Sequence, residues 1–571
     1  MTATAAQATP KPAANLRGQK RLRLIMGCFL VAFAAITAKL GYISLIDRGP
    51  PSTPVAADDF KIPRPDIVDR NGEVLATDIQ VASLYAEPNK IIDIDEAVEQ
   101  LTANVQGLDA TTLRRKLSMD RGFIWLKRQV SPDEQQRVHD LGIPGVGFRT
   151  EPLRVYPKGR LASHILGYVD VDSRGLAGIE KYLDDKGAIY AASLADPATR
   201  SAYPAQLSID VRVQHAVEEE VQKAIVKYKA KAGGGVVLDA NTGEVVALAS
   251  FPDFNPNQPI DAQKPDHGNR MSGLVFELGS VVKAVTFAMA LDAGVCNLQS
   301  SYDARYPLIV GRARISDYHA QRRVLTVPEI FMYSSNIGTA KMALDVGLEG
   351  HQAFLRKVGF MDRLRTELPE AARPLLPHRW SKISTVTAAF GHGIAVQPLQ
   401  GASVTAALLN GGKLIPPTLL KRDQQTADEL AVQVIKPQTS EMMRYLFRLN
   451  VEKGTATKTD IPGFLIGGKT GTAEKVVAGR YVKNRLLTSF IGAFPMDHPR
   501  YVVLIMLDEP QPLPETYGFA TAGWNAVPTA SKVLARLAAI FDLEPHLTEA
   551  DIEKLTKAEN KKQAAAVLDD N

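Results

Sequence analysis

A serine and a lysine three residues apart are the first pair in this chain with the means to do chemistry. Ser280 and Lys283 open a run that continues to Leu291 and is apolar on nearly every side of a helix, which indicates a buried helix. Burial removes the hydration of a lysine and favours its uncharged amine. Lys283 is therefore a candidate proton acceptor for the Ser280 hydroxyl. If the pair stood alone, a capping serine beside a lysine that reaches solvent would be the simpler explanation.

Two later motifs make the chemical interpretation stronger. Residues 333–336 are Tyr-Ser-Ser-Asn and supply Ser-x-Asn through Ser334 and Asn336. Residues 467–472 are Gly-Gly-Lys-Thr-Gly-Thr and supply Lys-Thr-Gly. The order Ser-x-x-Lys, Ser-x-Asn, Lys-Thr-Gly is typical of penicillin-binding proteins and serine β-lactamases. A fixed tetrapeptide such as Lys-Thr-Gly-Thr is rare by chance, so the ordered trio predicts a serine acyl-transfer site.

The elements around these motifs predict an α+β domain. An amphipathic helix is expected over Val211–Tyr228, followed by a β-hairpin whose turn is at Asn241-Thr242-Gly243. A mainly helical middle comes next, and two β-rich runs and a closing helix follow Lys469. One sheet built from both ends of this region and flanked by helices fits that order. The expected strands and closing helix are Gly235–Asp239, Val245–Ser250, Leu487–Phe494, Tyr501–Leu507 and Ala526–Ile540.

The N-terminus has the pattern of a membrane anchor. Residues 1–23 carry five basic residues and no acid, and residues 24–46 are mostly apolar and long enough to cross a bilayer as a helix. Basic flanks stay in the cytoplasm, so the rest of the chain is expected outside it. A cleaved signal peptide is the alternative, but its apolar core would be shorter. Lys39 either reaches the outer headgroups or contacts a partner's transmembrane helix.

Length and composition exclude several other functions. A chain of 571 residues is too long for a single core, and its net charge of +5 forms no basic stripe interleaved with aromatic residues. Nucleic-acid binding is therefore not expected. The two cysteines, Cys28 and Cys296, have neither metal nor redox spacing, and no intrachain disulfide is expected between them. We predict no cofactor and no metal.

Further stretches of the chain match one family. The short link between Gly167-Tyr168 and Gly178-Ile179-Glu180 is typical of its cell-division members, since the cell-elongation type usually has an insertion there. From about residue 20 to 540 the chain resembles the class B penicillin-binding proteins, and in particular the division-specific septal peptidoglycan D,D-transpeptidases. The other stretches that carry the resemblance are Arg64–Gly72, Arg154–Pro157, Val237–Asp239, Asn255–Asn257, Phe390–Gly393 and Gln397–Gln400.

The resemblance implies the domain organisation. It predicts a transpeptidase domain with the penicillin-binding and serine β-lactamase fold, an antiparallel sheet flanked by helices, on an elongated mixed α/β pedestal with one N-terminal transmembrane helix. The pedestal should begin with a hairpin at Asn71-Gly72. The expected segments are a cytoplasmic arm (1–23), an anchor (24–46), a pedestal (47–205), a transpeptidase domain (206–545) and a polar tail (546–571).

The resemblance also implies a role for each motif residue around one cleft. Ser280 would be the nucleophile, Lys283 its base, and Ser334 the group that passes the proton to the leaving amine. The amide of Asn336 would hydrogen-bond Lys283 and the substrate backbone. The backbone N–H groups of Ser280 and Thr472 would form the oxyanion hole. The substrate's terminal carboxylate is expected on a strand edge made of Lys469, Thr470, Gly471 and Thr472.

The expected activity is cross-linking of stem peptides that end in D-Ala-D-Ala, with β-lactams as acylating inhibitors. The implied location is the inner membrane at the division septum, with the catalytic domain in the periplasm. A SEDS-family glycan polymerase and other division proteins are the implied partners. The alternatives are an elongation-type transpeptidase, a penicillin-binding sensor or scaffold without activity, and a secreted β-lactamase.

Overall fold

The computed structural model describes residues 64–187, 204–477 and 479–549, and near the N-terminus residues 26–27, 29–37 and 39. The chain divides into two compact units, Met1–Phe60 and Lys61–Asn571. In the first unit, residues 29–37 are helical, and the apolar side chains of Phe29, Leu30 and Phe33 are exposed. No helix among the described residues is both long and apolar enough to span a bilayer. The predicted arm, much of the predicted anchor and most of the predicted tail lie outside the described residues.

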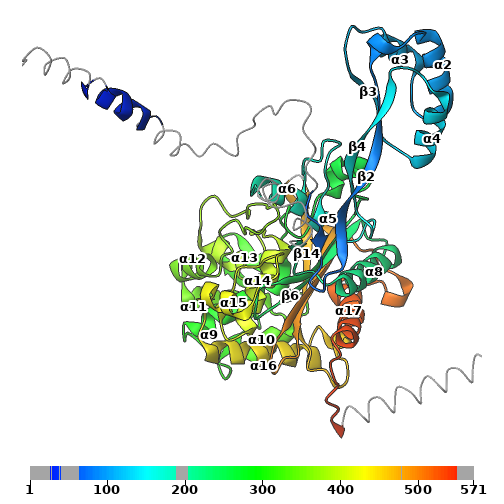
Figure 1. Ribbon diagram of the computed structural model, residues 1–571. Helices are drawn as coiled ribbons and strands as arrows, with labels where there is room; N and C mark the ends of the chain where they lie inside the picture. The colour runs from blue at the N-terminus through cyan, green and yellow to red at the C-terminus, as the bar shows by residue number, and fades with distance from the viewer. Residues whose placement is uncertain are drawn as a thin grey trace, which may run out of the picture. The chain divides into compact units, whose positions relative to one another are not determined.

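The second unit contains a five-stranded antiparallel sheet in the order β14-β15-β16-β6-β7 (Figure 1). The two strands from the start of the domain thus lie beside the three from its end, as the sequence predicted. Val236 and Leu504 face one side of the sheet, and Val237 and Val503 face the other, because side chains alternate along a strand. The strands are β6 (Ala232–Asp239), β7 (Val245–Phe251), β14 (Gly467–Val477), β15 (Arg480–Phe494) and β16 (Tyr501–Asp508).

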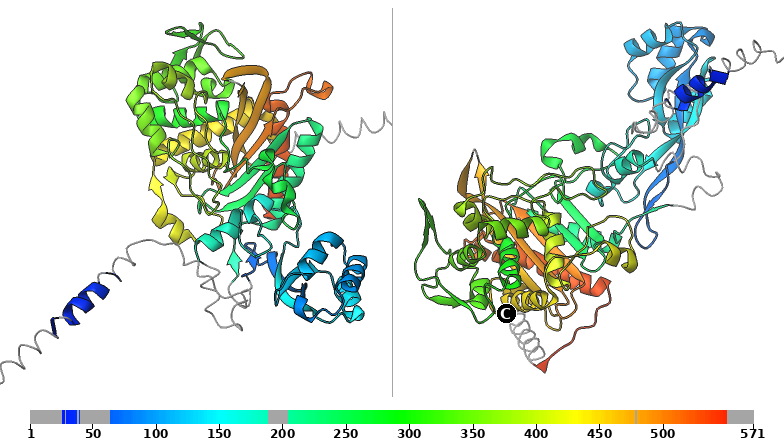
Figure 2. Two further views of the ribbon diagram at one scale, coloured as in Figure 1. Left: turned by 90° about the horizontal axis from the view of Figure 1, so that it is seen from above. Right: turned by 90° about the vertical axis from the view of Figure 1, so that its left-hand side faces the viewer.

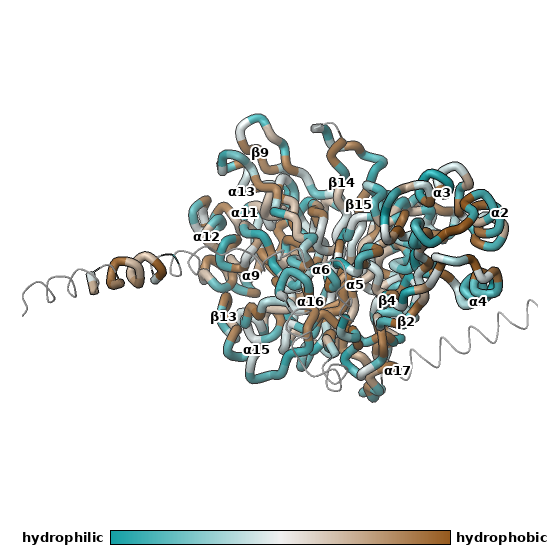
Figure 3. The backbone as a smooth tube through the Cα atoms, turned by 45° about the horizontal axis from the view of Figure 1, so that its top comes forward, coloured by the Kyte–Doolittle hydropathy of each residue, from teal (hydrophilic) through white to brown (hydrophobic). Residues whose placement is uncertain are grey.

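Helices cover both faces of this sheet (Figure 2). On one face α8 (Val211–Lys227) and α17 (Ala526–Ile540) pack through Val213, Val217 and Val533. On the other face the central helix is α14, whose residues are all buried. Figure 3 shows apolar residues gathered around α16, with polar ones along the outer loops near α15. The helices on this side are α9 (Lys283–Asp292), α10 (Val327–Tyr333), α11 (Asn336–Val346), α12 (Leu348–Lys357), α13 (Lys382–Ala388), α14 (Pro398–Leu409), α15 (Gln424–Leu430) and α16 (Pro437–Lys453).

A second sheet lies N-terminal to this domain. The predicted hairpin at Asn71-Gly72 is present, and Gly72 has the positive φ of +90° that its turn needs. Three helices, α2 (Ile94–Asn104), α3 (Ala110–Leu117) and α4 (Pro132–Leu141), pack with strands β2 and β3 through Leu84, Leu101 and Leu126. The strands are β1 (Ile67–Val68), β2 (Val74–Ala86), β3 (Ile124–Val130), β4 (Val146–Val155) and β5 (Ala205–Gln206).

Buried ion pairs explain two of the matched N-terminal stretches. Arg64 pairs with Glu180 at 2.8 Å, and Arg154 pairs with the same carboxylate at 2.6 Å. Glu180 lies in the short helix α6 (Gly178–Asp185), so one buried carboxylate joins segments that are more than a hundred residues apart. An ion pair also connects the two sheets: Arg70, in the turn between β1 and β2, pairs at 2.8 Å with Glu244, the residue before β7.

Candidate active site

The predicted nucleophile lies in a tight turn ahead of a buried helix. Ser280 is in the 3₁₀ turn η5 (Gly279–Val282), and α9 begins at Lys283. Residues i and i+3 of a 3₁₀ turn lie on the same side, which places the serine and the lysine on one side of the chain. The predicted burial is confirmed, because every α9 residue from Lys283 to Leu291 is buried. The turn is a local difference from the continuous helix that the apolar run suggested.

The three motifs meet at one hydroxyl group. Lys283 Nζ donates to Ser334 Oγ at 3.0 Å and also to the Ser334 carbonyl oxygen. Lys469 Nζ donates to the same Ser334 Oγ at 3.0 Å. Among the described residues no hydrogen bond joins Ser280 to Lys283, and such bonds often tighten only when substrate is bound. A hydroxyl that accepts two N–H bonds keeps its own proton to donate.

Local backbone geometry brings Ser334 to this point. Ser334 is the residue after α10 and has a φ of +57°, in the left-handed region. The chain reverses there, and Ser335 then caps α11 by accepting from the Gly338 N–H at 3.1 Å. Left-handed conformations of non-glycine residues are uncommon and often occur at functional sites.

Burial perturbs both amines. Lys283 and Lys469 have no exposed surface. Burial, and secondarily the charge of Lys469, holds the pKa of Lys283 well below its usual range, while Asp317 acts in the opposite direction. Burial alone lowers the pKa of Lys469 to about 7. A lysine that is uncharged for part of the time near neutral pH can accept a proton, as a general base must.

Strand β14 lies directly against the nucleophile turn. A Cβ atom on Gly471 would lie 2.5 Å from Ser489 Oγ and even closer to the Leu278 carbonyl oxygen, so only glycine allows this approach. Lys469 and Gly471 share one face of the strand. Thr470 is on the other face, where its hydroxyl is buried and lies 2.6 Å from the Thr455 hydroxyl. The hydroxyl of Thr472 accepts from the Ala522 N–H at 3.1 Å. The structure therefore brings Lys469 and Gly471, but not the hydroxyls of Thr470 and Thr472, to the side of Ser334.

Asn336 is held by a neighbouring loop. Its amide donates to the Ser316 carbonyl oxygen at 3.0 Å, and no hydrogen bond to Lys283 is found among the described residues. Asp317, which follows Ser316 in the same loop, accepts from Ser335 Oγ at 2.7 Å and from the Ile337 N–H at 2.9 Å. Asp317 thus fixes the start of α11, and the sequence offered no motif that would have identified it.

Two family models cover most of this arrangement. The model described as the penicillin binding protein transpeptidase domain matches residues 233–535, and the penicillin-binding protein dimerisation domain matches residues 61–187. The chain belongs to the penicillin-binding protein family. This confirms the resemblance and the expected fold class of the catalytic region, and makes the chain a serine-type transpeptidase.

Individual relatives of this penicillin-binding protein also include transpeptidases. It is 38% identical to the probable peptidoglycan D,D-transpeptidase FtsI of Caulobacter vibrioides, over 91% of this chain and 88% of the relative. It is 29% identical to the peptidoglycan D,D-transpeptidase FtsI of Escherichia coli K12, over 93% of this chain and 94% of that one. A crystal structure of penicillin binding protein 3 from Mycobacterium tuberculosis with aztreonam has the same fold, with a TM-score of 0.64, 24% identity, and coverage of 86% and 99% of the two chains.

The Phe390–Gly393 stretch of this penicillin-binding protein lies over the nucleophile turn. A Cβ atom on Gly391 would lie 2.8 Å from the Gly279 carbonyl carbon, so the two backbones touch. Burial, and then the charge of Lys283, lower the pKa of His392 to about 4. Its ring centroid is 5.4 Å from that of Tyr481, whose hydroxyl donates to Glu277 at 3.1 Å. The sequence identified this stretch by resemblance alone, and only the structure shows that it touches the turn before Ser280.

Proposed function

We propose that this penicillin-binding protein cross-links septal peptidoglycan by transferring the acyl group of one stem peptide to an amine of a neighbouring stem. The observation that carries the proposal is the Ser334 hydroxyl, which accepts hydrogen bonds from Lys283 and Lys469 at 3.0 Å each. It connects a lysine suited to accept a proton with a cation suited to bind a carboxylate. The relatives named as peptidoglycan D,D-transpeptidases support the class of substrate.

The first half of the reaction forms an acyl-enzyme. Ser280 Oγ attacks the carbonyl carbon between the two terminal D-alanines while Lys283, uncharged, takes the hydroxyl proton. The backbone N–H groups of Ser280 and Thr472 stabilise the oxyanion. Lys283 then returns a proton to Ser334 as the Ser334 hydroxyl gives its own to the departing nitrogen. The C–N bond breaks, which leaves an ester on Ser280 and releases D-alanine.

The second half of the reaction makes the cross-link. An acceptor amine attacks the ester carbonyl carbon and gives up a proton, the ester C–O bond breaks, and Ser280 regains its proton. The product is a new amide between two stems. A β-lactam enters the same first half, but its amine remains tethered to the acyl group when the ring opens, so the acyl-enzyme persists.

Four residues of β14 and one of α11 complete the proposed site. Lys469 binds the terminal carboxylate of the donor stem, and Gly471 lets the substrate lie against the strand. Thr472 supplies its backbone N–H to the oxyanion, because its side chain shares the Thr470 face of β14. Thr470 supports the position of β14 from the opposite face of the strand through its hydrogen bond to Thr455. Asn336, at the first position of α11, presents its side chain to the substrate backbone.

We also propose that residues 24–46 anchor the enzyme in the inner membrane with its catalytic domain in the periplasm. The exposed apolar side chains of the helical residues 29–37 support this placement, as does the basic arm that precedes them. A SEDS-family glycan polymerase and other septal division proteins are the proposed partners, on the strength of the family resemblance.

Cross-linking of purified glycan strands tests the proposal. The wild-type enzyme should form stem-peptide dimers and bind a fluorescent penicillin covalently, and Ser280→Ala should do neither. Ser118→Ala is the control and should behave as wild type, because Ser118 is an exposed serine directly after α3, beside the second sheet. Cells depleted of the enzyme should grow as filaments. Dimers made by Ser280→Ala, or rounded depleted cells, would contradict the catalytic or the septal part of the proposal respectively.

A further inference from the structure

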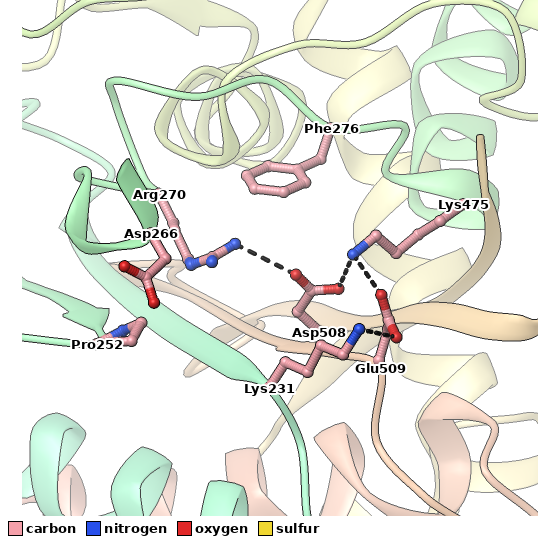
Figure 4. A pocket seen from close by; sticks show the side chains of 8 residues that line it. All are labelled: Lys231, Pro252, Asp266, Arg270, Phe276, Lys475, Asp508 and Glu509. Carbon is pink, nitrogen blue, oxygen red and sulfur yellow. Dashed lines mark hydrogen bonds and ion pairs between the residues drawn. The ribbon is translucent and has the colours of Figure 1, made fainter. Parts of the chain in front are cut away.

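A second cluster of charged side chains lines a hollow of about 460 Å³ at the end of the main sheet (Figure 4). The hollow lies where β16 ends and β6 begins, because Asp508 pairs with Ala232 there. Phe276, four residues before the nucleophile, lines it from above in this view. None of these charged groups has a part in the reaction described above.

Asp508 is the centre of the cluster. Its side chain is 5% exposed and accepts from Lys475 Nζ at 2.7 Å and from Arg270 Nη1 at 3.2 Å. Glu509 follows in a left-handed conformation, with a φ of +53°, and binds the same Lys475 at 2.9 Å. Lys231, the residue before β6, forms an ion pair with Glu509 at 2.7 Å.

The two cations on Asp508 belong to the two elements that carry the reacting groups. Lys475 is on β14, three residues beyond Thr472, just after a register shift between Glu474 and Lys475. Arg270 is on the segment that leads from β7 to Ser280, and its guanidinium also donates to the Phe251 carbonyl oxygen at 3.0 Å. One carboxylate therefore ties both elements to the same strand, β16.

Ion pairs provide the connection at this end of the sheet. Nearer the nucleophile, β14 already touches the segment before Ser280, because Gly471 lies against the Leu278 carbonyl oxygen. At this end of the sheet the charged groups surround a hollow, and the ion pairs of Asp508 join the two elements there. Strand β14 is also one of the two edge strands of this sheet, and among the described residues it pairs with β15 alone. Without the carboxylate, Lys475 would keep its ion pair with Glu509, but Arg270, which is 12% exposed, would lose its ion pair with Asp508, which is unfavourable.

We propose that Asp508 is a positioning residue for acyl transfer. By holding β14 and the segment before Ser280 at a common spacing, it sets the separation of the Ser280 and Thr472 N–H groups, one of which comes from each element. This inference rests on the proposed function. Its effect is expected on the rate of the chemical step, because the oxyanion develops only in the transition state.

Acylation of the full-length enzyme by a fluorescent penicillin tests this inference, with the maximal rate and the half-saturating concentration measured separately. Asp508→Asn keeps the shape and removes the charge. We expect its maximal rate to fall about 10- to 100-fold, the order of loss that follows displacement of a reacting group by a fraction of an ångström to 1 Å. The half-saturating concentration should change less than about threefold, since ground-state contacts remain.

A matched control separates positioning from general stability. Glu220 is a buried carboxylate that also bridges two cations, Lys223 at 3.3 Å and Arg536 at 3.1 Å. It joins α8 to α17, which pack on the face of the sheet opposite α14. Glu220→Gln should lower the melting temperature without slowing acylation. If it slows acylation as much as Asp508→Asn does, the positioning role is overturned.

Lys475→Met removes one of the two ion pairs of Asp508 and keeps the other, so it provides a second test if Asp508→Asn does not fold. Where both fold, the double variant should lose less than the product of the single losses, because both changes break the same ion pair. A maximal rate within twofold of wild type for Asp508→Asn and Lys475→Met would overturn the inference while leaving the proposed function intact. Failure of the wild type to acylate would instead refute the proposed function.

Discussion

Replacing Gly391 with alanine should slow acylation about 100-fold. Gly391 has a φ of +83°, and a Cβ atom there would lie 2.8 Å from the Gly279 carbonyl carbon, 2.9 Å from the Gly279 Cα and closer still to the carbonyl oxygen. Real Cβ atoms almost never approach other atoms within 3.0 Å, so one backbone must move. The residue after Gly279 is the nucleophile, whose N–H is a proposed oxyanion donor. Displacement of a reacting group by about 1 Å costs on the order of 100-fold in rate.

Gly393→Ala is the control for backbone strain. Gly393 is in the same loop and also has a positive φ, +76°, but a Cβ atom there would only meet Thr387 Oγ1 at 3.4 Å. Both alanines carry the cost of a left-handed conformation, about 1–2 kcal/mol, so the melting temperature should fall for both, and further for Gly391→Ala because of its clash with Gly279. The assay is the maximal rate of acylation by a fluorescent penicillin. If the two variants acylate within threefold of each other, contact with the nucleophile turn does not govern the rate and the reasoning is wrong.

Three further predictions concern the motif residues. Acylation by a saturating penicillin should become faster as the pH rises, because Lys283 must lose its proton to act as the base and burial lowers its pKa. The variant Lys283→Arg cannot release a proton, so its acylation should be at least about 100-fold slower and should not increase with pH. The half-saturating concentration of a substrate with a free carboxylate should increase above about pH 7, where Lys469 becomes uncharged, and a constant value from pH 6 to 9 would count against Lys469 as its ligand. Thr470→Val should lower the free energy of unfolding by about 1 kcal/mol through loss of the hydrogen bond to Thr455, while the half-saturating concentration stays within about twofold; a larger rise in that concentration would indicate direct contact with substrate.

Local sequence patterns were sufficient to predict those helices and strands whose apolar residues recur with the period of the element. The helix Ala526–Ile540 is found with the predicted bounds, and the strand Val245–Ser250 is longer by one residue. The apolar run after Ser280 predicted that Lys283 would be buried, and its exposure is zero. Such features depend on the period of apolar residues, which the sequence displays directly.

The sequence alone determined which residue types this protein has for acyl transfer, since three short motifs in a fixed order are rare by chance. Only the tertiary structure decided which of them meet. It joins Lys283 and Lys469 through Ser334, and turns the Thr470 hydroxyl to the far face of β14. It also places Asp317 at the start of α11, where no motif marks it, and Gly391 against Gly279. The physical reason is that these contacts link residues tens to hundreds of positions apart, so they depend on how the helices and strands pack and not on any pattern within one segment.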